Sequence, residues 1–420
     1  MNQWLDLIWN FEIENFKSLR HVSISVKPIT ILIGLNSSGK SSVIQYLEIL
    51  KQTTKTNSNL LVTDRELINL GKFEDIVSHT AERKEISFTM GGDRIQWLHH
   101  PFGMHTEYDY SFTVDSKGLK CHDCSMISGE IRLQGRFNKG RNRPKVRISL
   151  GENTMDFIAE GDIGHPMRLF ESISSSQNFD FEEIETFLNV IKQELNDFFL
   201  IPAMRGISSP SYPLDAKASE DIMDSNNLNQ QAIKFASTVV YKSPEIEKKI
   251  NKWLSKITGI TIRARTIPDK QAAVEASRGR NESNIINEGF GSNQLVYMFT
   301  QIATAPECSL IGIEEPEVHL HPRAQSALSK VLLEIARDEG KNLIITTHSE
   351  HVLYGILTEI AKGKLKTDEV AIYHFALSRD GITRVEKLKI DEKGRLEKGI
   401  PDFFETDLNE FKDFLEAMKP

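Results

Sequence analysis

Short apolar runs recur along the chain, and each is followed by a loop of small or polar residues. The run ITILI, residues 29–33, is rich in β-branched residues, and residues 309–313 (SLIGI) and 342–347 (NLIITT) have the same character. Continuous apolar runs of this length are typical of strands that are buried on both faces of a parallel sheet. The pattern therefore predicts three central strands.

After each of the first two runs, the apolar residues recur at helical spacing. Behind the first run these residues lie on one face of a predicted helix: Val43, Ile44, Leu47 and Leu50. Behind the second run Pro322 stands at a predicted first helical position, where its missing N–H costs nothing. The stripe that follows it is Ala324, Leu328, Val331, Leu332 and Ile335. Strands that alternate with helices predict an α/β fold around a parallel sheet.

Two other regions have different patterns. Residues 85–180 alternate apolar and polar positions between Gly-rich breaks, as in EISFTMGG and EIRLQGRF, which predicts inserted β-hairpins. Residues 229–257 predict one or two helices, with Pro244 breaking the pattern. No heptad pattern persists for more than a few turns, which excludes long coiled-coil arms.

Composition indicates a folded, multi-lobed protein. The chain has 420 residues, of which 39% are hydrophobic and 26% charged, so two or three lobes with real cores are expected. A net charge of -8 argues against nonspecific nucleic-acid binding by the whole surface. Three cysteines are too few for a disulfide framework, so a reducing compartment is expected.

The sequence also bears on localisation. The N-terminal residues have no continuous apolar core of the kind found in a signal peptide. No segment approaches the roughly 18 consecutive apolar residues that a membrane span needs. We therefore expect a cytoplasmic protein.

The loop after the first strand carries the strongest motif. GLNSSGKS, residues 34–41, fits the phosphate-loop spacing G-x-x-x-x-G-K-[ST]. Its backbone N–H groups point inward at a helix N-terminus, whose dipole favours anions. Lys40 is predicted to contact the β- and γ-phosphates of ATP, and the Ser41 hydroxyl to ligate Mg²⁺. The predicted nucleotide-binding residues are Asn36, Ser37, Ser38, Gly39, Lys40, Ser41 and Ser42.

The second and third strands end in residues that suit hydrolysis. Glu314 and Glu315 stand at the end of the second strand, and His348 follows the third. One carboxylate near bound phosphates can hold Mg²⁺, and another can orient or deprotonate an attacking water. A histidine beside the γ-phosphate can hold that water in line.

Together these motifs resemble the ATP-binding-cassette (ABC) ATPase head, a P-loop NTPase, in the branch shared by RecF, the structural-maintenance-of-chromosomes (SMC) proteins and the OLD family. IEEPEVHLHP and THSEH look especially like the OLD-like ATPases of bacteria. The resemblance implies that Glu314 aids Mg²⁺ binding, Glu315 is the catalytic glutamate and His348 is the switch residue. The wider ABC pattern has Asp where Glu314 stands. The resemblance offers no confident Q-loop glutamine, with Gln45 and Gln96 as candidates.

The segment GFGSNQ, residues 289–294, lies where ABC heads carry the signature loop that completes the ATP site of a second subunit. The resemblance implies that it contacts a γ-phosphate held by another chain. The candidates in trans are Gly289, Gly291, Ser292, Asn293 and Gln294, and whether Gly291 or Ser292 takes the role of the usual serine stays open. A homodimer or higher even oligomer is therefore expected.

The expected fold is an ABC-ATPase head with an inserted β-hairpin region and a helical subdomain. The expected divisions are 1–80 (phosphate loop), 81–200 (β-rich insertion), 201–280 (helical subdomain and connecting strand), 281–360 (signature, acidic strand and switch histidine) and 361–420 (small C-terminal extension). The segment FFLIPAMRGISSPSYP also resembles a family segment in which an arginine at the place of Arg205 recurs. A buried salt bridge would explain that arginine equally well, so it receives no role.

Two clusters in the insertion allow more than one interpretation. A basic stretch could touch the phosphates of DNA or RNA, or be a solvated hairpin, which is the commoner case: Arg136, Lys139, Arg141, Arg143, Lys145 and Arg147. Cys121 and Cys124 have metal-knuckle spacing, and His99, His100 and His105 lie upstream. Without a second pair at good spacing, no zinc site is predicted.

The C-terminal residues are too few to hold the nuclease domain of OLD nucleases, and they resemble the short extension of nuclease-less OLD-like ATPases. Phe403, Phe404, Phe411 and Phe414 are expected in a core or interface. The resemblance implies the ATPase subunit of a bacterial antiphage defence system that controls a separate effector protein, a nuclease or toxin. Two alternatives stay open: a RecF-like clamp that binds duplex DNA with ATP, and a binding module in which nucleotide is structural.

Overall fold

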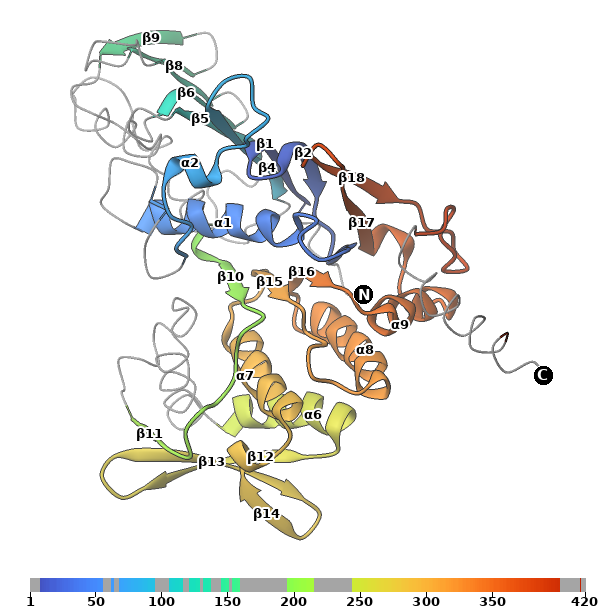
Figure 1. Cartoon of the computed structure of the whole chain (residues 1–420). Helices are drawn as coiled ribbons and strands as arrows, with labels where there is room; N and C mark the ends of the chain where they lie inside the picture. Colours follow the sequence, from blue (N-terminus) through green and yellow to red (C-terminus); the bar gives the residue numbers. More distant parts are fainter. Residues whose placement is uncertain are drawn as a thin grey trace.

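The computed structural model describes residues 8–55, 62–63, 68–94, 106–115, 121–128, 131–136, 145–150, 153–158, 195–214, 244–400 and residue 416. A six-stranded sheet lies at its centre (Figure 1). In spatial order the strands are β10 (Phe198–Ile201), β15 (Leu310–Glu314), β16 (Asn342–Thr347), β3 (Ile29–Gly34), β17 (Val370–Leu377) and β18 (Thr383–Leu388). All neighbours are parallel except β17 and β18. The three predicted central strands are confirmed, and they lie side by side.

Both faces of this sheet are buried, which explains the continuous apolar runs. Ile29, Ile31 and Ile33 join one hydrophobic cluster, whereas Leu32 joins the cluster on the opposite face. Helix α1 (Lys40–Lys55) covers the face of Leu32. The other face is covered by α7 (Phe290–Thr304), α8 (Pro322–Asp338) and α9 (Glu350–Ala361). Each fully buried Ile or Leu contributes about 1.5–3 kcal/mol relative to an exposed one, so both layers stabilise the sheet.

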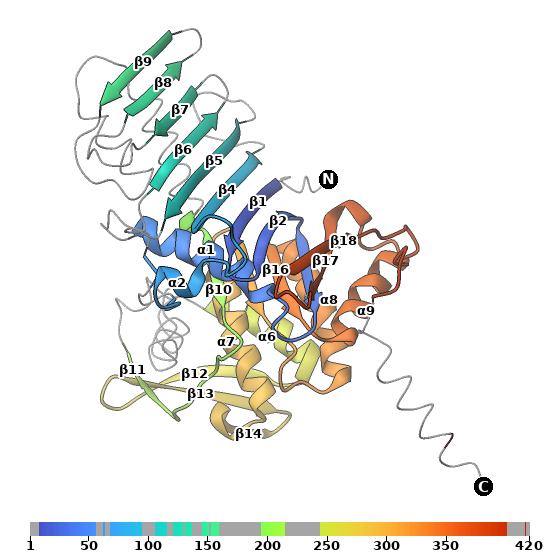
Figure 2. The same ribbon diagram turned by 45° about the horizontal axis from the view of Figure 1, so that its top comes forward.

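A second, antiparallel sheet packs on the outer side of α1. Its strand order is β2 (Leu19–Ser25), β1 (Ile8–Phe16), β4 (Glu85–Arg94), β5 (Thr106–Asp115), β6 (Cys121–Ser128), β7 (Ile131–Arg136), β8 (Lys145–Leu150) and β9 (Asn153–Ile158). Figure 2 shows these strands as one row that extends away from the central sheet. Tyr46 of α1 stacks on Phe88 of β4, with ring centroids 5.1 Å apart. The predicted hairpins are therefore present up to residue 158, as a continuation of the N-terminal strand pair.

A helix and a small sheet complete the lower part of Figure 1. Helix α6 (Pro244–Thr258) begins at the proline that breaks the sequence pattern, and its Trp253 packs on Phe299 of α7 at 5.6 Å between ring centroids. A small sheet contains β11 (Tyr212–Pro213), β12 (Thr261–Ile267), β13 (Gln271–Arg278) and β14 (Asn281–Asn284). The short helix α2 (Phe73–Ile76) follows α1, and 3₁₀ turns span Ile285–Asn287 and Thr367–Glu369.

Two features bear on the predicted organisation. Strand β17, within residues 361–420, pairs with the phosphate-loop strand β3, so this part of the chain is built into the central sheet. Among the helices that the structure describes, none combines the length and apolar character needed to cross a bilayer.

Candidate active site

The loop between β3 and α1 is held by glycines where a side chain would not fit. Gly34 and Gly39 have φ angles of 147° and 98°. A Cβ atom on Gly34 would lie 2.1 Å from the carbonyl oxygen of Phe375 in β17, and one on Gly39 would lie 2.7 Å from the Thr383 hydroxyl. Glycine is therefore required at both positions for two reasons: the loop needs these positive φ angles, and the neighbouring strands β17 and β18 leave no room for a side chain.

Lys40 begins α1 and its ammonium turns back onto the loop. The Nζ atom donates to the carbonyl oxygens of Gly34 at 2.9 Å and Leu35 at 2.8 Å. Burial lowers the pKa of Lys40 to about 8, although the nearby carboxylates of Glu315 and Glu317 raise it in part. Carbonyl dipoles are weaker partners for an ammonium than phosphate oxygens, so an anion that reaches the loop is a better partner for this group.

A cavity of about 690 Å³ opens beside the loop. All seven predicted nucleotide-binding residues line it: Asn36, Ser37, Ser38, Gly39, Lys40, Ser41 and Ser42. Glu315 and His348 line the same cavity from the ends of β15 and β16. The carboxyl ends of adjacent parallel strands meet at one edge of a sheet, which brings together residues that are far apart in sequence.

Glu314 lies next to Ser41. The Ser41 side chain donates a hydrogen bond to the Glu314 carboxylate, and the N–H of Ala203 lies 3.4 Å from it. Burial raises the pKa of Glu314, whereas these hydrogen bonds lower it in part. A hydroxyl and a carboxylate that converge beside a phosphate loop are the oxygen ligands that Mg²⁺ prefers, so the residues present fit this ion.

Glu315 and His348 lie in contact at the cavity wall, with 3.2 Å between Oε1 and Nε2. Both side chains are partly exposed, at 36% and 31%, so water reaches them. Glu315 has a left-handed backbone (φ 42°), and its N–H donates to the Thr346 carbonyl oxygen at 2.9 Å. The Glu315 carbonyl oxygen in turn accepts a hydrogen bond from Arg205 at 3.0 Å, so hydrogen bonds hold both polar groups of this residue in a conformation that is uncommon for a residue with a side chain.

Glu317 supports His348, and the sequence interpretation assigned it no role. One oxygen of its buried carboxylate accepts from the Thr347 hydroxyl at 2.6 Å and from the His348 N–H at 2.9 Å. The third carboxylate of IEEPE therefore holds the peptide that carries the histidine. The sequence signal for this role is the position of Glu317, two residues after the paired carboxylates.

The cavity also contains residues from turns that the sequence did not single out. Lys17, in the turn between β1 and β2, donates from Nζ to Oε1 of Gln45 at 2.6 Å, and both residues line the cavity. Asp380 and Gly381, between β17 and β18, line it as well. Of the two glutamine candidates, Gln45 is thus at the cavity, and Gln96 lies outside the described residues. Turn residues at this edge carry no local motif, so only the fold reveals them.

The predicted signature segment forms the first turn of α7, with Gly289 as its N-cap. Its residues are absent from the described lining of the cavity. Gly291, Asn293 and Gln294 are buried, and Asn293 uses its amide on Ile207, whereas Phe290 is 51% exposed. Gly289 and Ser292 are the more accessible residues of the segment, and its contact with a second chain stays a prediction.

Most of the basic stretch and the cysteine motif are not described in atomic detail. Lys139, Arg141 and Arg143, together with His99, His100 and His105, lie outside the described residues, as do the four C-terminal phenylalanines Phe403, Phe404, Phe411 and Phe414. The backbone of four other residues is described, as part of strands β6, β7 and β8: Cys121, Cys124, Arg136 and Lys145. Arg147 is exposed and pairs with Asp156 at 2.7 Å, as expected for a solvated hairpin.

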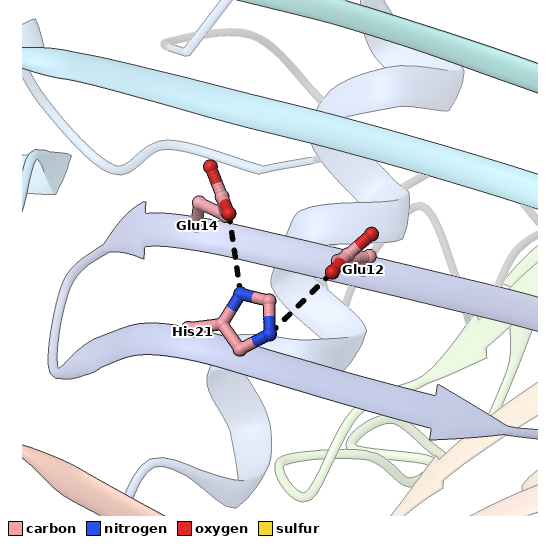
Figure 3. Close-up of side chains that lie close together, drawn as sticks. All are labelled: Glu12, Glu14 and His21. Carbon is pink, nitrogen blue, oxygen red and sulfur yellow. Dashed lines mark hydrogen bonds and ion pairs between the residues drawn. The ribbon is translucent and has the colours of Figure 1, made fainter.

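A second cluster of ionisable groups lies on the β1–β2 hairpin, away from the residues that line the cavity. Figure 3 shows His21 between Glu12 and Glu14, with His21–carboxylate distances of 3.5 and 3.2 Å. Their possible ligand atoms all lie within 4.8 Å of one another, but all three side chains are at least 44% exposed. Contacts between exposed polar side chains of this kind are worth about 0–1 kcal/mol, and pairing across the hairpin accounts for the cluster.

One protein-family model matches most of the chain. The family model described as "AAA domain, putative AbiEii toxin, Type IV TA system" matches residues 29–353, from the phosphate-loop strand to α9. No curated protein sequence matches the chain.

Solved structures of SMC heads have a similar fold. A head bound to the C-winged helix domain of ScpA aligns with a TM-score of 0.50 and 13% identity, over 91% of this chain and 98% of that one. An SMC head with an extended coiled coil, bound to the C-terminal domain of ScpA derived from Pyrococcus furiosus, aligns at 0.48 and 13% identity over 98% and 99%. At this identity the first likeness shows the ABC-ATPase head fold alone.

Proposed function

The chain belongs to the family described as "AAA domain, putative AbiEii toxin, Type IV TA system", and on that premise we propose that it hydrolyses ATP with Mg²⁺ in the cavity beside the phosphate loop. The observation that carries the proposal is the common lining of this cavity. The phosphate loop, Glu315 and His348 come from three separate parts of the chain and meet around one space.

Each residue has a chemical task in this proposal. Lys40 exchanges its bonds to the carbonyls of Gly34 and Leu35 for bonds to the β- and γ-phosphates. Glu315 accepts a proton from the attacking water, and His348, 3.2 Å from that carboxylate, holds the water in line with the γ-phosphate. Ser41 and Glu314 would hold Mg²⁺, which neutralises charge on the phosphate oxygens.

We further propose that the site is completed by a second copy of the chain. The support is that the first turn of α7 is missing from the described lining of its own cavity. Large apolar side chains are also exposed on the loops at the carboxyl ends of the strands and on α7: Leu35 at 58%, Met204 at 76% and Phe290 at 51%. Exposed apolar groups of this size favour a protein partner. A homodimer or larger even assembly, with Gly289 and Ser292 facing the γ-phosphate of a neighbour, satisfies both observations.

The proposed biological role is that of the ATPase subunit of a cytoplasmic bacterial antiphage defence system that controls a separate effector. The family description, which names a toxin of a type IV toxin–antitoxin system, is compatible with a defence role. The role itself is an analogy, since one fold serves many functions. Copurification of the protein with the product of a neighbouring gene would support it.

Two variants test the proposed hydrolysis. Lys40→Ala removes the ammonium from the loop and should abolish ATP binding, which a fluorescent ATP analogue measures. Glu315→Gln keeps the shape of the side chain but not the base, so it should bind ATP, lose at least about a hundredfold in kcat, and accumulate the assembled form. Light scattering with and without ATP reports that assembly. Hydrolysis by Glu315→Gln at the wild-type rate would refute the proposal.

A DNA clamp is the alternative, because the fold is that of an SMC head. A clamp should bind duplex DNA only with ATP, and its affinity should fall steeply as salt rises. Among the described residues of the basic stretch, Arg147 is already paired with Asp156, which does not favour this alternative. DNA binding that requires ATP and weakens with salt would nevertheless establish it.

A further inference from the structure

Arg205 is a buried cation whose hydrogen bonds go to main-chain carbonyls. It follows β10 in the segment that crosses the end of β15, and only 2% of the residue is exposed. One terminal nitrogen donates to the carbonyl oxygens of Pro202 and Glu314, both at 2.7 Å, and the other donates to that of Glu315 at 3.0 Å. The guanidinium is thus hydrogen-bonded to the main chain of both acidic residues that are proposed to act in hydrolysis.

This arrangement is costly for a merely structural role. Burial lowers the pKa of Arg205 to about 10, while the carboxylates of Glu317 and Glu314 favour its charged form. A buried charge is often replaced by apolar residues without loss of stability, so its presence calls for another explanation. The left-handed backbone of Glu315, at φ 42°, supplies one, because the Glu315 carbonyl is held by Arg205 and the Glu315 N–H by Thr346.

The other end of the same segment is fixed to α7. The side chain of Asn293 accepts from the Ile207 N–H at 2.6 Å and donates to the Ile207 carbonyl at 2.8 Å. Asn293 lies in the first turn of α7, three positions after Phe290, where that helix begins. Residues 202–207 therefore join the acidic end of β15 to the helix end that would meet a neighbouring chain.

We propose that Arg205 is a positioning residue that holds the backbone of Glu315 in the conformation needed for hydrolysis. Through the hydrogen bonds between Ile207 and Asn293, the position of Glu315 then depends on the position of α7. The proposal rests on the proposed function and adds regulation to it. When α7 closes on the nucleotide of a neighbour, the shift reaches Glu315 of its own site through segment 202–207. Two sites in a dimer then influence each other, and such coupling is reciprocal.

The test compares Arg205→Met and Arg205→Lys with Asn293→Ala and with the double variant Arg205→Met/Asn293→Ala. Met removes all three hydrogen bonds, whereas Lys keeps the charge but lacks the planar fork, so Lys should restore kcat only in part. We expect kcat to fall about tenfold or more in Arg205→Met while KM changes less than about threefold. The double variant should lose less than the product of the two single losses, because both act through one segment. Arg263→Met, on the exposed face of β12, is the control and should retain wild-type kcat.

The outcomes separate this inference from the proposed function. Folding of every variant is checked by thermal unfolding, and if Arg205→Met does not fold, Arg205→Lys carries the kcat and KM comparison alone. Wild-type kcat in a folded Arg205 variant, or fully multiplicative losses in the double variant, would overturn the inference. If either result is found while Glu315→Gln is inactive, the positioning role of Arg205 is refuted and the proposed hydrolysis stands. Wild-type hydrolysis by Glu315→Gln would overturn the proposed function and this inference together.

Discussion

The depressed pKa of Lys40 leads to a quantitative prediction for ATP binding. In the free protein the ammonium has a pKa of about 8 because burial disfavours its charged form. The triphosphate stabilises that charge, so ATP binds the protonated protein better. The sign follows directly: binding is strongest below the free-protein pKa and weakens as pH rises through it.

The magnitude follows from the fraction of protonated Lys40. With a pKa of about 8 this fraction is roughly ten elevenths at pH 7 and roughly one eleventh at pH 9, so the affinity for ATP should fall about tenfold, or about 1.4 kcal/mol. Burial also lowers the pKa of Lys17, which lines the same cavity, so a variant that removes Lys17 is needed as a control.

The assay is a titration with a fluorescent ATP analogue at several pH values, with two control variants. Lys40→Arg places in the loop a guanidinium that stays charged over this pH range, so the curve should flatten, whatever the absolute affinity. Lys17→Met removes the second cavity lysine and should leave the Lys40 step in place. A wild-type affinity that stays constant from about pH 7 to about pH 9 would refute the reasoning.

Two further predictions concern stability and geometry. Glu317→Ala removes the acceptor of the Thr347 hydroxyl and the His348 N–H, and should lower the free energy of unfolding by about 1–3 kcal/mol in urea titrations and reduce kcat; unchanged values for both would contradict the role given to Glu317. Gly291→Ala places a Cβ atom 2.6 Å from the His319 carbonyl oxygen, and should cost about 1–3 kcal/mol in the same titration. Gly399→Ala, where a Cβ atom meets nothing within 4 Å, is its matched control, and equal stability of the two variants would show that α7 can shift freely.

Local sequence determined the strands, the helix starts and the phosphate loop. Residues 29–33 and 342–347 are mostly apolar, and both faces of the sheet that they form are buried. The phosphate loop is also local, since two glycines, a lysine and a helix start suffice to form an anion site. Pro322 begins α8 because the ring of proline suits the first helical position.

The tertiary structure alone decided which residues share the cavity and what Arg205 and Asn293 do. Lys17 and Asp380 reach the cavity through turns whose sequences carry no motif. Asn293 is predicted from the sequence only as a residue of the signature loop, and the structure shows that its side chain is hydrogen-bonded to Ile207. The sequence assigned Arg205 no role, and the structure shows that it donates to carbonyl oxygens beside the acidic strand. Hydrogen bonds between segments far apart in the chain depend on the packing of strands and helices, so no local pattern encodes their partners.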